Sequence, residues 1–411
     1  MNPQYFEAYT SILREEILPA VGCAEAISLA FCAAKAHEVL GMQPTAVTVS
    51  LSTGVLKNVK NAVIPNTNGL KGIRAAVAAG IVCGDSSQGM QVLQGITQEQ
   101  IAAADHFDKT VRIDVACAET ECPIYISVTL YARTSYSRVV IANGHSNIVE
   151  IMKNGEAILK KPIGLPVEED QLDLSCLNLH DIVSYAEQVD LHDVKDLLDM
   201  QIVYNTTICE EGLSKHYGTD IGRILISEQN PDVKTTARAY AAAGCDAKMN
   251  GCDMPIALLC GSGNQGITAS VPVICYAKHF SVENACLYRA LLISDLLSVY
   301  LRTRAGHTSS SCGAIFSGCA AGAAIAYLLE RSERAVASTL RNSVSLIPEN
   351  VCSGTGAACA ATVASAVELG IWGYQMYRKE GPRNISGEDT TRLADEAVRS
   401  ICNHSDGMIE S

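Results

Sequence analysis

The apolar residues of this chain change their spacing twice, and this change limits the fold more than any other feature. They recur at helical spacing over residues 5–40, then alternate as in strands, and return to helical spacing from about residue 178. The alternating part contains runs such as AVTVSLS and PIYISVTLYA. We therefore predict an α+β fold, in which a mostly helical domain (1–42 and 170–411) is split by an inserted small α/β domain (43–169).

Two helices are expected at the start of the chain, Tyr5–Leu18 and Ala24–Val39, because Pro19 ends the first of them. Later helical segments are rich in Ala, Gly and Ser and carry almost no charge, so we expect them in the middle of the protein. These later segments are Ala237–Ala243, Ala285–Arg302, Ala314–Leu329 and Ala361–Met376.

Charge and hydropathy exclude several classes of protein. The chain has a net charge of −13 and no basic cluster with interleaved aromatic residues, so it lacks the basic face that binds nucleic acid. Its first residues include Glu7, Glu15 and Glu16 where a secretory signal needs an apolar run. The uncharged stretches Met254–Ala277 and Ala305–Leu329 are interrupted by Gly and polar residues. We therefore expect no membrane span and a cytoplasmic protein.

Seventeen cysteines in a long chain of this kind point to buried thiols or metal ligands rather than to disulfides. The sequence contains no pair of cysteines separated by two residues, so an ordinary structural zinc site is not expected. Any metal centre must draw its ligands from distant parts of the chain.

Four segments place a Gly- and Ser-rich turn directly before an apolar helix. Three of them carry a cysteine within two residues of a glycine at the helix start, namely Cys23, Cys312 and Cys352. The amides and dipole of a helix N-terminus favour a thiolate, which makes these cysteines candidate ligands. The plainer alternative is that they pack as small buried side chains.

The fourth segment, CGSGNQGITASVPVI, offers amides and polar side chains to a small carboxylate. Its candidate binding residues are Ser262, Asn264 and Gln265. A nucleotide loop is not favoured, because the segment lacks the Lys-Ser/Thr pair of a P-loop and a clear βαβ context.

Six motifs together resemble the L-cysteine desulfidase family, which is related to the iron–sulfur L-serine dehydratases. They are GCAEAISLA, IPNTNGLKG, GHSNI, GSGNQGITASVPV, SSSCGAIFSGCAAG and ENVCSGTGAACA, in this order over nearly the whole chain. The resemblance implies a [4Fe–4S] cluster held by Cys23, Cys312 and Cys352, and substrate contacts from Asn66 and Thr67. It also implies that the small α/β domain docks over a helical, cluster-binding domain.

The reaction that the resemblance implies is loss of the β-substituent, sulfide or water, from a small L-amino acid such as L-cysteine. Three thiolates on four irons leave one iron open as a Lewis acid. The products would be pyruvate and ammonia, and no pyridoxal phosphate is needed. This would be an enzyme of amino-acid catabolism.

For the general base our first choice is His145 in ANGHSNI, because an imidazole accepts a proton near neutral pH. His307 is a rival, and Lys57, Lys60 and Lys248 are weaker ones.

Two motifs depart from the family pattern. The family usually reads Gly-Cys-Thr-Glu-Pro at the first cysteine and Cys-Asp-Gly-Ala-Lys at the last, where this chain has GCAEA and CSGTGAAC. The alternatives are therefore an L-serine dehydratase, a lyase for a larger β-substituted amino acid, or a non-catalytic sensor that binds a small amino acid. Cys319 or Cys359 could also replace a proposed ligand. Soluble enzymes of this kind are commonly homodimers, which is our expectation here.

Overall fold

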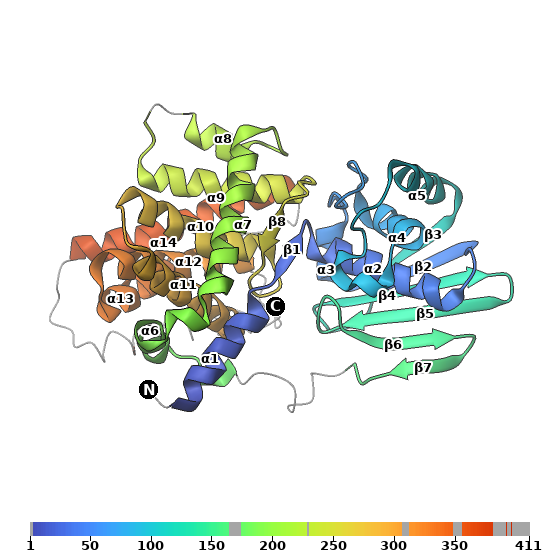
Figure 1. The fold of residues 1–411 in the computed structure, drawn as a ribbon, viewed down its shortest axis with the longest axis horizontal. Coiled ribbons are helices and arrows are strands. Elements are labelled where there is room, and N and C mark those ends of the chain that lie inside the picture. The colour runs from blue at the N-terminus through green and yellow to red at the C-terminus, as the bar shows by residue number, and fades with distance from the viewer. Residues whose placement is uncertain are drawn as a thin grey trace, which may run out of the picture.

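The computed structural model describes residues 3–163, 174–227, 230–305, 312–347 and 356–380, together with Arg392 and Glu396. A lobe of packed helices and a lobe built on a β-sheet stand side by side (Figure 1). The α+β fold predicted from the change in spacing is confirmed.

The α/β lobe contains a six-stranded sheet in the order β3-β2-β4-β5-β6-β7. Strands β2 and β3 are parallel and the other neighbours are antiparallel, so the chain must cross over between β2 and β3, which it does through three helices and a 3₁₀ turn. The strands are β2 Ala46–Leu51, β3 Arg112–Cys117, β4 Tyr125–Ala132, β5 Ser135–Ala142, β6 Ile148–Lys153 and β7 Glu156–Lys160. The crossover elements are α3 Thr53–Val59, α4 Gly72–Cys83, η1 Ser86–Gln91 and α5 Gln98–Thr110.

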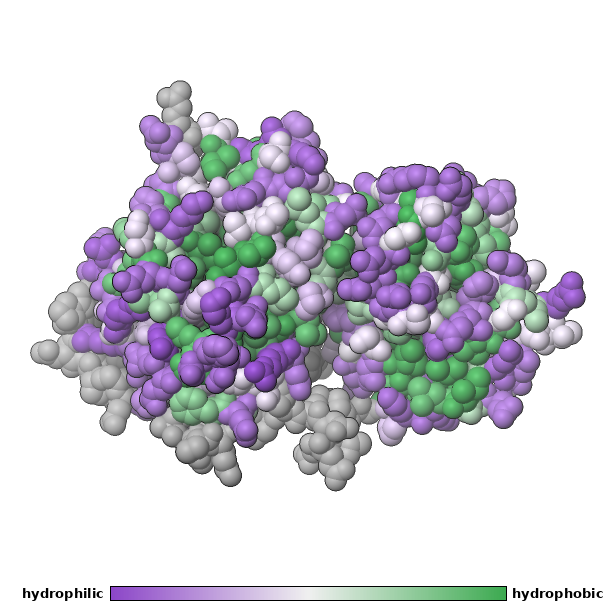
Figure 2. All heavy atoms as spheres, viewed as in Figure 1, coloured by the Kyte–Doolittle hydropathy of each residue, from purple (hydrophilic) through white to green (hydrophobic). Residues whose placement is uncertain are grey.

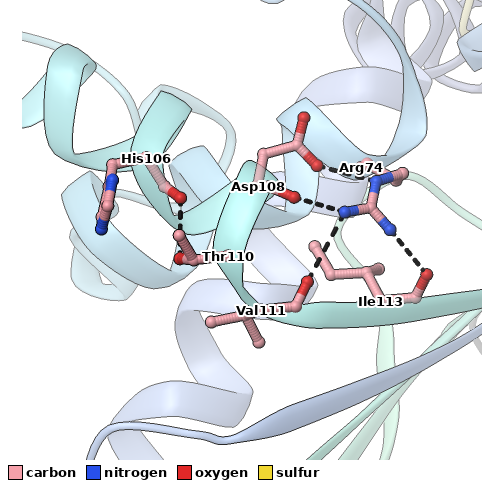
Figure 3. Close-up of polar contacts among 6 residues, drawn as sticks. All are labelled: Arg74, His106, Asp108, Thr110, Val111 and Ile113. Carbon is pink, nitrogen blue, oxygen red and sulfur yellow. Dashed lines mark hydrogen bonds and ion pairs between the residues drawn. The ribbon is translucent and has the colours of Figure 1, made fainter.

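Arg74 on α4 ties the crossover to the sheet (Figure 3). Its Nε lies 2.8 Å from Asp108 Oδ1, and its Nη1 donates to the backbone oxygen of Ile113 at 2.9 Å. Its Nη2 donates to the backbone oxygens of Asp108 and Val111. One guanidinium therefore fixes the end of α5 and the start of β3 together.

The boundary predicted at residue 43 differs from the packing. Helix α2 (Ala24–Leu40) shares its core with β4, β5 and α4, so it belongs to the α/β lobe and not to the helical one. Only the segment before Cys23 packs with the helical lobe. Because α2 is apolar on nearly every face, its pattern predicts burial without indicating against which partner.

The helical lobe is arranged around α12 (Gly313–Glu330), which packs against α10, α11, α13 and α14. Small residues allow close approach: a Cβ placed on Gly318 would lie 2.2 Å from the backbone oxygen of Ala366 on α14. The other helices of this lobe are α1 Pro3–Glu16, α6 Leu179–Gln188, α7 Lys195–Ser214, α8 Ile221–Ile226, α9 Val233–Met249, α10 Gly263–His279, α11 Asn284–Ala305, α13 Glu333–Val344 and α14 Gly356–Glu380. Short elements complete it: β1 Pro19–Val21, η2 Leu174–Cys176, η3 Leu191–Asp193 and β8 Pro255–Ala257.

Helices α11 and α12 are long and apolar enough to cross a membrane, by length and composition. In the part of the chain that the structure describes, 78% of the most apolar window of α11 and 83% of that of α12 are buried inside the protein. Figure 2 shows hydrophobic residues in separate patches divided by hydrophilic ones on the visible face of the protein. Mostly buried core helices pass the same test of length and composition, so these two helices are weak evidence for a membrane span.

The two lobes meet around the antiparallel pair β1 and β8. Gly22, directly after β1, has a φ of +68°, and a Cβ on it would lie 2.2 Å from Cγ of Pro65. The backbone N–H of Asn66 donates across the junction to Asp253 Oδ1 at 3.1 Å. The chain therefore passes from the helical lobe to the α/β lobe at Gly22, which packs directly against Pro65 of the α/β lobe.

Candidate active site

The predicted GSGNQG segment forms a tight turn and the first turn of α10. Cys260 and Gly261 have φ values of +50° and +69°, as in the central positions of a type I′ turn. Leu259 and Ser262 close this turn with two backbone hydrogen bonds, at 3.2 and 3.0 Å. The turn directs the start of α10 toward the junction of the two lobes.

The start of α10 has no side-chain cap, because the Ser262 hydroxyl does not bond to the first turn. Asn264 Oδ1 accepts from Lys248 Nζ at 3.4 Å and from Cys245 Sγ at 3.4 Å. Gln265 donates to the backbone oxygen of Cys260 at 3.5 Å, whereas its buried Oε1 has no hydrogen-bond partner. The three predicted carboxylate-binding residues thus lie at one helix start, with two of them in contact with neighbouring elements.

Lys248 lies in the last turn of α9 and is 5% exposed. Besides Asn264, its Nζ contacts the thioether of Met249 at 3.5 Å. Its positive charge favours lower pKa values of Cys23, Glu25 and His145 in the other lobe. From the sequence, this lysine was only a weaker candidate for the base, because nothing in its helix indicated burial at the junction.

Cys23 is the N-cap residue of α2 and is buried. Its Sγ donates to Glu25 Oε2 at 3.3 Å, and Asn58 Nδ2 donates to Glu25 Oε1 at 2.9 Å. Burial and the Glu25 carboxylate raise the pKa of the Cys23 thiol to about 12, against the opposing effect of Lys248. Burial alone would raise the pKa of Glu25, but His145, Lys248 and the hydrogen bonds outweigh it and hold that pKa below its usual value.

Sequence reasoning missed Glu25. The available signal was an acidic side chain in the first turn of an apolar helix that has no other charge before Lys35, two residues after a candidate ligand. A carboxylate in such surroundings needs a partner, which the sequence alone does not identify.

His145 lies at the same junction. A Cβ placed on Gly261 would be 3.0 Å from Cε1 of His145, and Ser28 Oγ donates to the His145 backbone oxygen at 2.5 Å. The Nε2 atom is buried without a hydrogen-bond partner. Burial lowers the pKa of His145, Glu25 opposes this, and Lys248 adds to it. Burial thus favours the neutral form of the imidazole, which is the form that accepts a proton.

The remaining predicted ligands lie across the turn or outside the described ranges. Cys312 is the N-cap residue of α12, and a Cβ on its neighbour Gly313 would lie 2.5 Å from Cδ of Gln265. Cys312 thus lies next to the start of α10, whereas Cys23 is related to it only through the charge of Lys248, which bonds to Asn264. Cys352 and the rival base His307 lie outside the residues that the structure describes.

Cys319 is fully buried inside α12, and burial raises the pKa of its thiol to about 12. Cys359 lies half-buried in the first turns of α14. The rival lysines Lys57 and Lys60 are exposed on α3 and at its C-cap.

The side chains of Asn66 and Thr67 form hydrogen bonds within the α/β lobe. Asn66 Nδ2 donates to the Leu93 backbone oxygen at 3.1 Å, and Thr67 Oγ1 donates to that of Ile64 at 2.6 Å. Both residues border the junction through the bond from the Asn66 backbone to Asp253. Here they hold the turn whose Pro65 packs against Gly22, directly after β1.

Among the described residues, no group of three or more His, Cys, Asp or Glu side chains is arranged to hold a metal ion. The donor chemistry of the described part nevertheless fits an iron–sulfur cluster: Cys23 and Cys312 are both cysteines at helix starts, where amides stabilise thiolates. The predicted third donor is Cys352, and with it the set would be three thiols from three helix starts.

A separate cavity of about 210 Å³ lies between α7, α9 and the C-terminal half of α10. Thr206, Tyr240, Cys275 and Lys278 are among its lining residues, and it contains none of the predicted site residues.

The fold and the site define a two-lobed protein with a half-buried acid (Glu25), a buried amine (Lys248) and an imidazole of lowered pKa (His145) at the junction. The serine dehydratase alpha chain family matches residues 87–410, and the chain belongs to this family. Membership points to a lyase of the iron–sulfur serine dehydratase type.

Similar proteins from bacteria carry names that state no activity. A UPF0597 protein of Desulfitobacterium hafniense is 41% identical over 385 residues, which cover 94% of this chain and 89% of that protein. UPF0597 proteins of Finegoldia magna and Lachnoclostridium phytofermentans are 39% and 37% identical, over 96% and 99% of this chain and 94% and 97% of their own lengths. The relationship thus covers both lobes.

Proposed function

We propose that this protein is an iron–sulfur lyase that removes the β-substituent from a small L-amino acid, with L-cysteine the favoured substrate and L-serine the next. The observation that carries the proposal is the meeting of Cys23, Glu25 and His145 from one lobe with Lys248 and the start of α10 from the other. Family membership supports the reaction class, and the choice of cysteine rests on the motif resemblance.

Cys23, Cys312 and Cys352 would hold a [4Fe–4S] cluster. When bound, this cluster supplies an open iron that acts as a Lewis acid toward the leaving β-substituent. The high pKa of the Cys23 thiol belongs to the protein without metal, and coordination would release its proton.

His145 is the proposed base. Its buried, unpartnered Nε2 would take the α-proton of the substrate, while the β-substituent leaves as sulfide or water. The resulting aminoacrylate becomes an imine, which takes up water to give pyruvate and ammonia. Ser28 holds the His145 backbone and Gly261 leaves room for its ring, so both residues orient the base.

The protein is further proposed to act in the cytoplasm as a homodimer, with a small amino acid as its ligand and without nucleic-acid or membrane partners. The net charge of −13 supports the absence of a nucleic-acid partner.

Anaerobic purification followed by iron and sulfide analysis tests the proposal. We expect about four irons per chain and a broad absorption band near 400 nm, as for a cysteine-bound [4Fe–4S] cluster. Cys352→Ala should lose both, whereas Cys117→Ala, which removes an exposed thiol on β3, should keep them. Wild type that holds the cluster should release pyruvate from L-cysteine.

A second function, a sensor that binds a small amino acid without turnover, is favoured by the departures GCAEA and CSGTGAAC from the family motifs. It predicts iron-free protein that still binds an amino acid after replacement of Cys23, Cys312 and Cys352. Colourless wild type from strictly anaerobic cells would reject the lyase and favour this sensor.

A further inference from the structure

The cavity between α7, α9 and the C-terminal half of α10 has room for a small molecule. Its volume is about 210 Å³, and none of the residues at the lobe junction lines it. An apolar cavity of about 150 Å³ accepts benzene, whereas drug-sized ligands need about 300 Å³ or more. The cavity therefore fits one ring or one short branched chain together with a small polar group.

Much of the lining is apolar. Tyr240 of α9 and Val271 and Ile274 of α10 line the cavity, together with the thiol-bearing Cys275. Burial raises the pKa of the Cys275 thiol to about 12, so this side chain is uncharged near neutral pH and packs as a small apolar group. These side chains favour a ligand with an apolar body.

Thr206 on α7 brings to this lining a polar atom that the protein leaves without a partner. Its Oγ1 is buried and forms no hydrogen bond in the described part of the chain. The next residue, Thr207, donates to the Val203 backbone oxygen at 2.7 Å, and Thr236 in the same lining donates to that of Asp232 at 2.9 Å. Because a buried hydroxyl without a partner is costly, the Thr206 hydroxyl is available to a ligand.

Lys278 gives the rim of the cavity a positive charge. It is exposed in the last turn of α10, and no carboxylate of the described residues lies within 4.0 Å of its Nζ. His279, also in the lining, adds a second positive charge when it is protonated. None of the lining residues is acidic; Glu210 acts on Tyr240 by its charge but does not line the cavity. The charge at the rim therefore favours an anion.

We propose that this cavity binds a small carboxylic acid whose apolar body is one ring or a short branched chain. The body lies against Tyr240, Val271 and Ile274, and the carboxylate accepts hydrogen bonds from Lys278 and from the Thr206 hydroxyl. This site is distinct from the lobe junction, so the inference does not depend on the proposed lyase reaction.

Calorimetry on the full-length, anaerobically purified protein tests this with benzoate as the probe. Benzamide keeps the ring and the shape and loses the charge, whereas acetate keeps the carboxylate and loses the ring. We expect benzoate to bind about 3–10-fold more tightly than benzamide at low ionic strength, a modest ratio because Lys278 is exposed to water. Benzoate should bind at least about 30-fold more tightly than acetate, since the ring supplies the buried apolar area.

Two pairs of variants locate the probe. Thr206→Val keeps the shape of the side chain and removes the hydroxyl, so it should weaken benzoate binding about tenfold, whereas Thr207→Val should leave it unchanged. Lys278→Met should bring benzoate and benzamide to similar affinities. Lys215→Met, which removes an exposed lysine paired with Glu211 at 2.7 Å, should keep the wild-type ratio. The wild-type comparisons require no variant, so misfolding of a variant does not remove the test.

Equal binding of benzoate and benzamide by wild type, or no binding of benzoate, would overturn the inference. So would a loss of benzoate affinity in Lys248→Met with none in Thr206→Val or Lys278→Met, because the anion would then bind at the lobe junction. Benzoate binding that weakens as the protein concentration rises would show that a second copy of the chain covers the cavity, and would also overturn it.

Discussion

The His145 imidazole lies directly against Gly261, so that a Cβ on this glycine would be 3.0 Å from Cε1 and 3.4 Å from Nδ1. The two residues come from different lobes and join the candidate base to the turn before α10. This contact leads to the first prediction.

Gly261→Ala should lower kcat for the proposed elimination at least tenfold, because the methyl group displaces the base from its position. The backbone φ of +69° adds a penalty of about 1–2 kcal/mol to stability. Gly95→Ala separates the two effects: Gly95 has a φ of +72°, and a Cβ on it would meet nothing within 4 Å. Kinetics and thermal melts of both variants should show similar losses of stability but a loss of kcat in Gly261→Ala alone. Equal kcat values would reject the role of this contact.

The pH profile should show an acid limb set by His145. Its pKa lies below the usual 6.5 because burial disfavours the imidazolium. A base acts in its neutral form, so kcat/KM should rise with pH through a pKa below 6.5 and then level off. His145→Gln should remove this limb with most of the activity, while His192→Gln, at an exposed site, should leave it unchanged. An acid limb that persists in His145→Gln would point to another base.

The same shift has a consequence for stability. The unfolded chain binds a proton at His145 at a higher pH than the folded protein does, so the contribution of this group to stability is present above pH 6.5 and is lost as pH falls through the folded pKa. Denaturant melts between pH 5 and 8 should therefore show a smaller loss of stability on acidification in His145→Gln than in wild type. A steeper loss in the variant would contradict the sign of the shift.

In metal-free protein, the Cys23 thiol should react only slowly with alkylating reagents. This thiol is 2% exposed, and its pKa of about 12 leaves almost no thiolate at pH 8. Peptide mapping after brief iodoacetamide treatment should find Cys117, which is exposed, modified long before Cys23. Rapid modification of Cys23 in folded protein would show that its surroundings are open.

Arg74→Ala should destabilise the α/β lobe by about 1–2 kcal/mol, because it removes hydrogen bonds to the backbone oxygens of Ile113 and Val111 and the pair with Asp108. Arg112→Ala is the control: its pair with Asp114 is more exposed and should contribute less than about 1 kcal/mol. Urea melts give both values, and equal losses would mean that the backbone contacts of Arg74 contribute little.

The sequence could predict the elements but not how all of them pair. Strand alternation and helical spacing are local properties, and they located β2, β4, β5 and the central helices α11, α12 and α14. Helix α2 packs in the α/β lobe and not, as the sequence had indicated, in the helical lobe. A helix that is apolar on nearly every face can pack against either lobe, so its sequence does not identify its partner.

At the site, the cysteines and the Gly-rich turns were visible because they mark local backbone geometry at helix starts. Neither the importance of Glu25 nor the burial of Lys248 was visible, since 223 residues separate them and their relation depends on contact between two lobes.

By itself, the sequence determined where helices and strands form, which turns carry candidate ligands, and the relationship to the iron–sulfur serine dehydratases, although not to cysteine desulfidases in particular. The tertiary structure alone decided that α2 packs on the sheet, and that an acid, an amine and an imidazole meet beside α10. The physical reason is that spacing and turn chemistry act over a few residues, whereas burial and charge depend on every element that packs against a group.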